Sequence, residues 1–263
     1  MHSLGLDGWL WAASLLGEAL VLLVLWRKRL LRTFPLFSAY LALNLVEDPL
    51  AWILHNGSPS TYFRFYFAVT LLDYALQLLV LLEIGFNVLS PVRRSLPART
   101  VSILLAGLMV SVLVAAWLAP HETAARMGAI GVVFLRLTVG LAVLRLLVFA
   151  VVAGFSQMLG IGWRNHVLQL TTGLAFYGAI SLFIQLALSR LNNTTAAYES
   201  SFRALIQLQS AAYVGTLLFW VWAFSRNDAP RREFTPQMRE VLVTIAGTAR
   251  RTRLTVTRGI EGK

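Results

Sequence analysis

Residues 62–89 constrain the fold more than any other stretch of this chain, because they are apolar yet contain polar side chains. These side chains are Asp73, Gln77, Glu83 and Asn87. At about 1.5 Å per residue, a helix of this length crosses the roughly 30 Å hydrocarbon core of a bilayer. A carboxylate in such a segment costs about 2.5 to 3.5 kcal/mol, so the helix is expected to turn its acids toward other helices. All these side chains lie within an arc of about 120° on a helical wheel, which predicts a buried helix with one polar face.

The composition also indicates a membrane protein. Of the 263 residues, 57% are hydrophobic and 13% are charged, whereas soluble domains carry about 25% charged residues. We expect one integral membrane domain, residues 1–225, followed by a basic tail, residues 226–263. The tail is shorter than the roughly 40 residues below which a chain seldom folds alone. The membrane domain is therefore expected to hold the whole fold.

Seven apolar segments are each long enough to form a transmembrane helix. They are residues 8–26, 36–55, 62–89, 101–119, 128–155, 165–188 and 202–224. Arg27, Lys28 and Arg29 follow the first segment, and Arg93 and Arg94 follow the third. Because basic residues concentrate in cytoplasmic loops, the N-terminus is predicted outside and the C-terminus in the cytoplasm. The predicted fold is an all-α bundle of seven transmembrane helices in the inner (plasma) membrane.

Polar side chains recur at helical spacing in the other segments too. In the second segment Tyr40 is followed by Asn44, Glu47 and Asp48 at i+4, i+7 and i+8, which places all of them on one face. Such faces predict a polar core between the helices. Its candidate residues are Glu18, Tyr40, Asn44, Glu47, Asp48, Asp73, Gln77, Glu83, Arg136, Arg145, Tyr177, Gln185 and Gln207.

The two basic residues of this set lie in the fifth segment, and the acids outnumber them. Depth in the membrane allows Arg136 to pair with one of three acids, Asp73, Glu47 or Glu18. It also allows Arg145 to pair with Glu83. The two arginines are nine residues apart, about 180° on an ideal helix, so they are not expected to face one core together. We expect Arg145 to be the one that extends to the inner interface.

The polar core has a functional and a structural interpretation. Acids without a basic partner inside a membrane are typical of a proton or cation path, or of a cavity for a polar ligand. Alternatively, the polar side chains hold the helices together through hydrogen bonds worth about 0.6 to 2 kcal/mol each.

Several chemistries are excluded by residues that the chain lacks. The absence of cysteine excludes disulfides, thiolate metal sites and iron–sulfur clusters. Lys28 and Lys263 are the only lysines, so no lysine in a late helix can form a retinal Schiff base. His121 and Glu122 begin a zinc motif that Ala125 breaks. We expect no metal, no cofactor and no catalytic residue, and hence no enzyme.

The basic tail has a second possible helix. Thr235 and Pro236 form a helix start, and the apolar residues from Met238 to Ala249 recur on one face. The tail is expected to lie on the anionic inner surface of the bilayer, or to dock a cytoplasmic protein partner. A nucleic-acid partner is not expected, although the net charge is +11, because the basic residues flank membrane segments. The membrane-surface residues are Arg231, Arg232, Arg239, Arg250, Arg251 and Arg253.

The third segment also carries a family resemblance. Residues 74–77 (YALQ), residues 82–89 (LEIGFNVL) and Pro91 resemble a family of bacterial seven-helix integral membrane proteins with no established activity. The resemblance implies the topology and transfers no functional residue.

Three functions remain as hypotheses. The leading one is a bacterial inner-membrane sensor that binds a small ligand in its polar interior and acts through a cytoplasmic partner. The alternatives are a proton-coupled transporter or cation channel that uses Glu18, Glu47 and Asp73, and a structural subunit of a larger membrane complex. An intramembrane enzyme that acts on lipid has no recognised nucleophile or metal cluster in this sequence.

Overall fold

The computed structural model of the chain describes residues 5–55, 59–89, 129–156, 165–190 and 198–226, together with Val110 and Trp117. Its helices are α1 (Leu6–Arg27), the 3-10 turn η1 (Leu30–Arg32), α2 (Pro35–His55), α3 (Pro59–Leu89), α6 (Ala129–Ser156), α7 (His166–Arg190) and α8 (Tyr198–Ser225). The prediction of an all-helical fold is confirmed for these residues. The predicted fourth span and the basic tail lie outside the described residues, except for Val110 and Trp117.

Five stretches of these helices are long and apolar enough to cross a membrane. They are Leu6–Arg27, Thr61–Asn87, Val132–Gly154, His166–Leu188 and Glu199–Ser225. Large apolar side chains cover the outside of the bundle, among them Trp9, Ile53, Phe63 and Phe183. Such an exterior suits contact with lipid rather than water. The chain is a multi-pass membrane protein.

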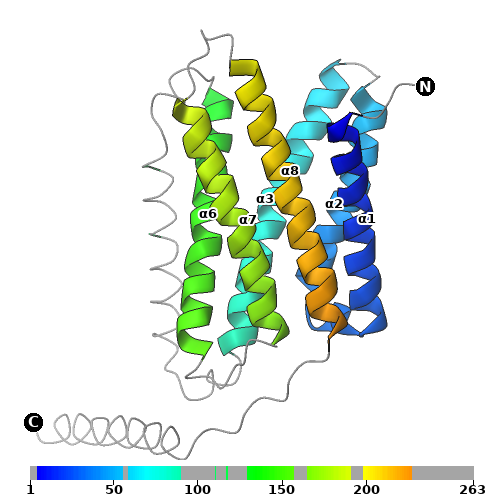
Figure 1. The fold of residues 1–263 in the computed structure, drawn as a ribbon, viewed down its shortest axis with the longest axis vertical. Helices are drawn as coiled ribbons and strands as arrows, with labels where there is room; N and C mark the ends of the chain where they lie inside the picture. The colour runs from blue at the N-terminus through cyan, green and yellow to red at the C-terminus, as the bar shows by residue number, and fades with distance from the viewer. Residues whose placement is uncertain are drawn as a thin grey trace, which may run out of the picture.

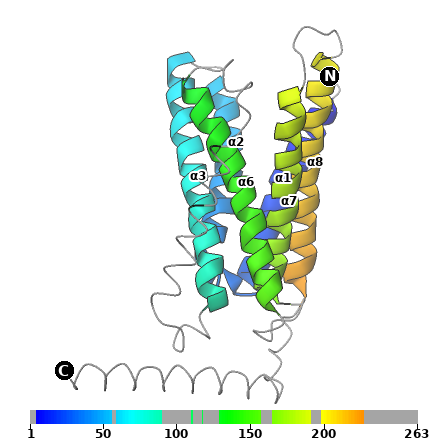
Figure 2. The same cartoon turned by 90° about the vertical axis from the view of Figure 1, so that its left-hand side faces the viewer.

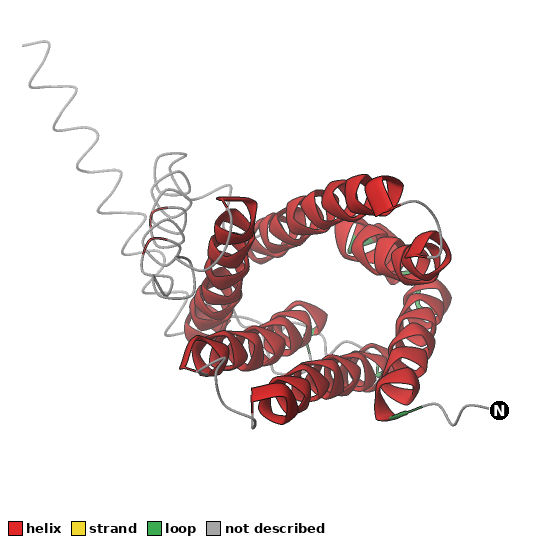
Figure 3. Ribbon diagram, turned by 90° about the horizontal axis from the view of Figure 1, so that it is seen from above, coloured by secondary structure: helices red, strands yellow, loops and turns green. Residues whose placement is uncertain are grey.

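The six described α-helices form a closed ring (Figure 3). Each helix packs on the next in the order α1, α2, α3, α6, α7 and α8, and α8 packs back on α1. Figure 2 shows α2 and α3 on one side of the ring, and α1, α7 and α8 on the other. A ring leaves its inner faces turned toward one shared axis, so polar residues from distant parts of the chain meet there.

Side-chain contacts give the relative direction of neighbouring helices. Phe67 packs on Phe134 and Gln77 bonds to Arg145, so α3 and α6 run parallel. The contact of Asp7 with Gln207 and the close approach of Gly17 to Leu217 show that α1 and α8 are also parallel. In Figure 1, α1 begins at the upper end of the bundle and α8 ends at the lower end.

The lower end of the ring, where α1 ends and α2 begins, is filled with aromatic side chains; we call it the aromatic half. Phe37 meets Trp220 edge to face with ring centroids 4.9 Å apart, and Phe34 lies 6.3 Å from Phe224. All are nearly inaccessible to solvent. A Cβ atom at Gly173 would overlap the indole of Trp220. The glycine therefore lets α7 and α8 approach closely enough to close this half.

Polar side chains in the aromatic half accept backbone N–H groups at the N-terminal ends of helices. The two carboxylate oxygens of Glu83 on α3 accept the backbone N–H groups of Leu36 and Phe37, at 3.1 and 3.0 Å. These N–H groups belong to the first turn of α2, where no helical carbonyl is available to accept them. Asn165 caps α7 similarly, because its side-chain oxygen accepts the N–H of Val167 at 2.9 Å.

Candidate functional site

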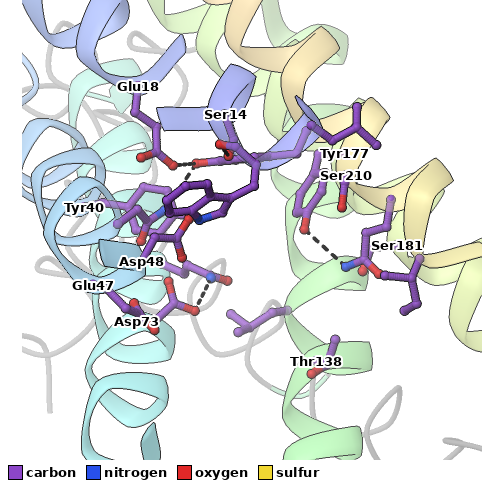
Figure 4. A pocket seen from close by; sticks show the side chains of 18 of the residues that line it. Ser14, Glu18, Tyr40, Glu47, Asp48, Asp73, Thr138, Tyr177, Ser181 and Ser210 are labelled. Carbon is purple, nitrogen blue, oxygen red and sulfur yellow. Dashed lines mark hydrogen bonds between the residues drawn. The ribbon is translucent and has the colours of Figure 1, made fainter. Parts of the chain in front are cut away.

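The upper end of the ring, where α1 begins, encloses a cavity of about 670 Å³; we call this part the cavity half. Every one of the six helices contributes to its lining. Asp7, in the first turn of α1, is exposed at the rim, and Glu18 lies about 16 Å deeper, at about 1.5 Å per residue. Polar residues of the lining (Figure 4) include Ser14, Glu18, Tyr40, Asn44, Glu47, Asp48, Asp73, Tyr74, Gln77, Thr138, Arg145, Tyr177, Ser181, Gln185, Gln209, Ser210 and Tyr213.

One hydrogen-bond network joins α1, α2 and α8. The hydroxyl of Tyr213 donates to Oε1 of Glu18 at 2.7 Å and accepts from Nδ2 of Asn44 at 3.3 Å. Glu18 is only 1% exposed. Its second oxygen, Oε2, has no hydrogen-bond partner within the part of the chain that the structure describes. An unpartnered carboxylate oxygen at this depth is unfavourable unless something else meets it.

A second network joins α3, α6, α7 and α8. Nε2 of Gln77 donates to Asp73 at 2.7 Å, and the guanidinium of Arg145 donates to Oε1 of Gln77. The guanidinium carbon of Arg145 lies 5.3 Å from the centroid of the Tyr177 ring, a cation–π distance. The Tyr177 hydroxyl in turn accepts from Gln209 at 3.2 Å. Arg145 is thus held by its neighbours, and Gln77 bridges it to Asp73.

The two sides of the cavity differ in charge. Asp7, Glu18, Glu47, Asp48 and Asp73 come from α1, α2 and α3, and Figure 4 shows the deeper four together on that side. The opposite side, on α6, α7 and α8, presents hydroxyl groups, amides and Arg145. No described residue donates a hydrogen bond to Glu47 or Asp48. We call Glu18, Glu47 and Asp48 the acidic wall.

The structure brings most of the sequence-predicted polar core into this one cavity, from every described α-helix except α8. The predicted residues that line it are Glu18, Tyr40, Asn44, Glu47, Asp48, Asp73, Gln77, Arg145, Tyr177 and Gln185. Gln207 lies outside the lining and donates to Asp7 at 2.8 Å.

Glu83 and the two arginines differ from the sequence-based expectation. Glu83 does not pair with Arg145, because both of its oxygens accept backbone N–H groups in the aromatic half. The prediction that Arg145 extends to the inner interface is wrong: it is buried and lines the cavity. Arg136 is instead the exposed arginine on α6. The half-turn separation was predicted correctly, but sequence spacing does not tell which side of a helix faces the ring.

Sequence reasoning missed part of the lining on α8. Its α8 candidate was Gln207, whereas the polar residues of α8 that line the cavity are Gln209, Ser210 and Tyr213. The spacing of Gln209 and Tyr213, at i and i+4, was an available signal. Tyr74 and Thr138 were also missed; their hydroxyls lie 2.8 Å apart and join α3 to α6.

The cavity acids do not form a metal site. Among the described residues, no three His, Asp or Glu side chains converge closely enough to hold a metal ion. The carboxylates of the cavity gather on α1, α2 and α3 without forming such a cluster.

Fold and site together define an all-helical, multi-pass membrane protein with a polar cavity inside a ring of helices. Comparison of the chain with protein families, with curated proteins and with solved structures finds no match.

Proposed function

We propose that this chain is a seven-span sensor of the bacterial inner membrane, which binds a small polar ligand from outside and acts through a cytoplasmic partner. The observation that carries the proposal is a polar cavity that is bounded at its deep end by the aromatic half. Small-molecule sites typically have volumes of about 300 to 1,000 Å³ with a few convergent polar groups, and the cavity of about 670 Å³ falls within that range.

The direction of the helices supports a seventh span. Because α3 and α6 run parallel, residues 90–128 must join opposite ends of the bundle. Residues 101–119 form an uncharged apolar stretch of the length that a bilayer crossing requires. A single crossing by this stretch gives seven spans and places the two chain ends on opposite sides of the membrane.

The charge distribution supports an outward-facing cavity. Arg27 ends α1 at the aromatic half, Lys28 and Arg29 follow it, and Arg32 ends η1. Basic residues of this kind mark the cytoplasmic side. The opposite end, where Asp7 lies at the cavity rim, then faces outward.

The aromatic half favours binding over conduction. Leu25, Phe37, Ile84 and Trp220 are buried below the cavity and belong to one continuous apolar core. Ions and polar solutes do not cross such a core without a large rearrangement. A ligand that enters the cavity therefore meets a closed end, as expected of a receptor.

Two neighbouring positions on α8 allow a matched test of ligand binding. Ser210 lines the cavity, whereas Ala211 is exposed on the outer face. Ser210→Phe is expected to fill the cavity and to abolish ligand retention, while Ala211→Phe leaves it unchanged. Native mass spectrometry of protein extracted in nanodiscs measures the retained small molecule. Equal retention in both variants would place the ligand elsewhere. Retention in neither variant nor wild type would favour a structural subunit whose polar residues only join helices.

A flux measurement separates the sensor from a transporter. Liposomes that contain the wild-type protein are expected to show no proton or cation flux across an imposed gradient. Flux that disappears in Asp73→Asn would instead assign a conduction role to the cavity acids.

Deletion of residues 231–263 tests the partner: it should abolish binding to the cytoplasmic protein and leave ligand retention intact.

A further inference from the structure

We infer that the cavity selects small organic cations, with an ammonium or amidinium group held against the acidic wall of Glu18, Glu47 and Asp48. The inference rests on the proposed function, because it names the ligand class of the same cavity. It concerns charge selection, and can therefore fail while ligand binding itself stands.

The first support is the charge balance of the lining. Arg145 is the only basic side chain among the described residues that line the cavity. Its guanidinium is engaged by Gln77 and Tyr177, and Gln77 links it to Asp73. The acidic wall is left without a cationic partner within the described chain. A cleft lined by one sign of charge attracts the opposite sign and raises its local concentration.

The second support is independent of the number of acids. Oε2 of Glu18 has no hydrogen-bond partner among the described residues, and only 1% of the residue is exposed. The Tyr213 hydroxyl satisfies the other oxygen. A ligand N–H group at Oε2 would supply the missing donor. A hydrogen bond from a charged donor would be roughly twice as strong as one from a neutral donor.

Aromatic residues next to the acidic wall favour an organic cation. Trp11 lines the cavity from α1, the helix of Glu18, and Tyr40 lines it from α2, the helix of Glu47 and Asp48. Tyr213 lines it from α8 and bonds to Glu18. Aromatic faces attract ammonium groups within about 6 Å. For a bare metal ion, the described residues offer no convergent ligand set.

The absence of cysteine in the chain makes charge selection directly measurable. Ser210→Cys places one thiol in the cavity with little change of shape. Its rate of modification is measured with trimethylammonium-ethyl, sulfonato-ethyl and methyl methanethiosulfonates, which are cationic, anionic and neutral. Each rate is divided by the rate with free mercaptoethanol, which removes the intrinsic reactivity of the reagent. Ser14→Cys, on the neighbouring helix α1, repeats the measurement should Ser210→Cys not fold.

We expect the cationic reagent to exceed the anionic one by about tenfold or more. Adding Glu18→Gln, Glu47→Gln and Asp48→Asn to the same background should bring the ratio close to one. Glu199→Gln, at an exposed position in the first turn of α8, is the matched control and should leave the ratio unchanged.

Each other result overturns a defined part of the argument. Equal rates, or faster modification by the anion, would refute cation selection and leave ligand binding standing if the neutral reagent reacts. A cation preference that survives removal of the acidic wall would assign the selectivity to other residues. If no reagent modifies either thiol in the folded protein, the cavity is closed to water, and the proposed function fails together with the inference.

Discussion

Glu83 and Glu18 show how differently the two halves of the ring use a buried carboxylate. In the aromatic half both oxygens of Glu83 are satisfied by the backbone of α2. In the cavity half Glu18 is buried even more completely, yet one oxygen has no partner among the described residues. The first arrangement stabilises a helix end, whereas the second leaves capacity for a ligand. Stability and binding are thus assigned to opposite ends of the same helices.

This contrast predicts that substitutions in the aromatic half affect stability most. Trp220→Ala should lower the free energy of unfolding by about 3 to 5 kcal/mol, because it empties a large buried volume. Trp222→Ala, two residues along, is the control: that side chain is 49% exposed, and a small effect is expected. Unfolding by titration with a denaturing detergent measures both. Similar losses in the two variants would contradict the aromatic half as the centre of stability.

The close approach of α7 and α8 gives the next largest effect. Gly173→Ala should destabilise the protein by about 1 to 3 kcal/mol, because the added methyl group overlaps the Trp220 indole. Gly215→Ala on α8 has open space around its Cβ position and should stabilise the helix by about 0.5 to 1 kcal/mol. The opposite signs are the test, and a stabilising Gly173→Ala would show that the two helices are not tightly packed.

The contact between Glu83 and α2 is expected to contribute less. Glu83→Gln keeps one acceptor oxygen and replaces the other with an NH2 group. This NH2 group would face a backbone N–H, and two donors cannot form a hydrogen bond. Losing one hydrogen bond and the anion at a helix N-terminus should cost about 1 to 2 kcal/mol. Glu199→Gln, which is exposed, serves as the control. Hydrogen exchange of the Leu36 and Phe37 amides should increase in Glu83→Gln only; unchanged exchange would argue against the cap.

The smallest stability effect is expected in the cavity half. Tyr213→Phe removes a hydroxyl that bonds to both Glu18 and Asn44, and should cost about 1 kcal/mol. Tyr66→Phe, at an exposed position on α3, is the matched control. Ligand retention should nevertheless fall in Tyr213→Phe and not in Tyr66→Phe. A loss of stability as large as that of Trp220→Ala would break the division between the halves.

The cavity-lining side of α2 could be predicted from the spacing of polar residues within that helix alone. Tyr40, Asn44, Glu47 and Asp48 recur at helical spacing on α2, and all four line the cavity. On α3 the same reasoning placed Asp73 and Glu83 on one polar side, but the two acids lie ten residues apart along the helix. They therefore reach different halves of the ring, and depth rather than face separates their roles.

The sequence by itself determined the all-helical membrane fold, because long apolar runs can satisfy their backbone in lipid only by forming helices or closed barrels. It also determined which residues share a side of each helix. Only the tertiary structure decided that Arg145 faces the cavity while Arg136 faces outward, and that Tyr213 rather than Gln207 meets Glu18. Periodicity defines directions relative to a helix's own axis. The rotation of each helix, and hence each polar residue's partner, is set by packing against neighbours that are distant in the chain.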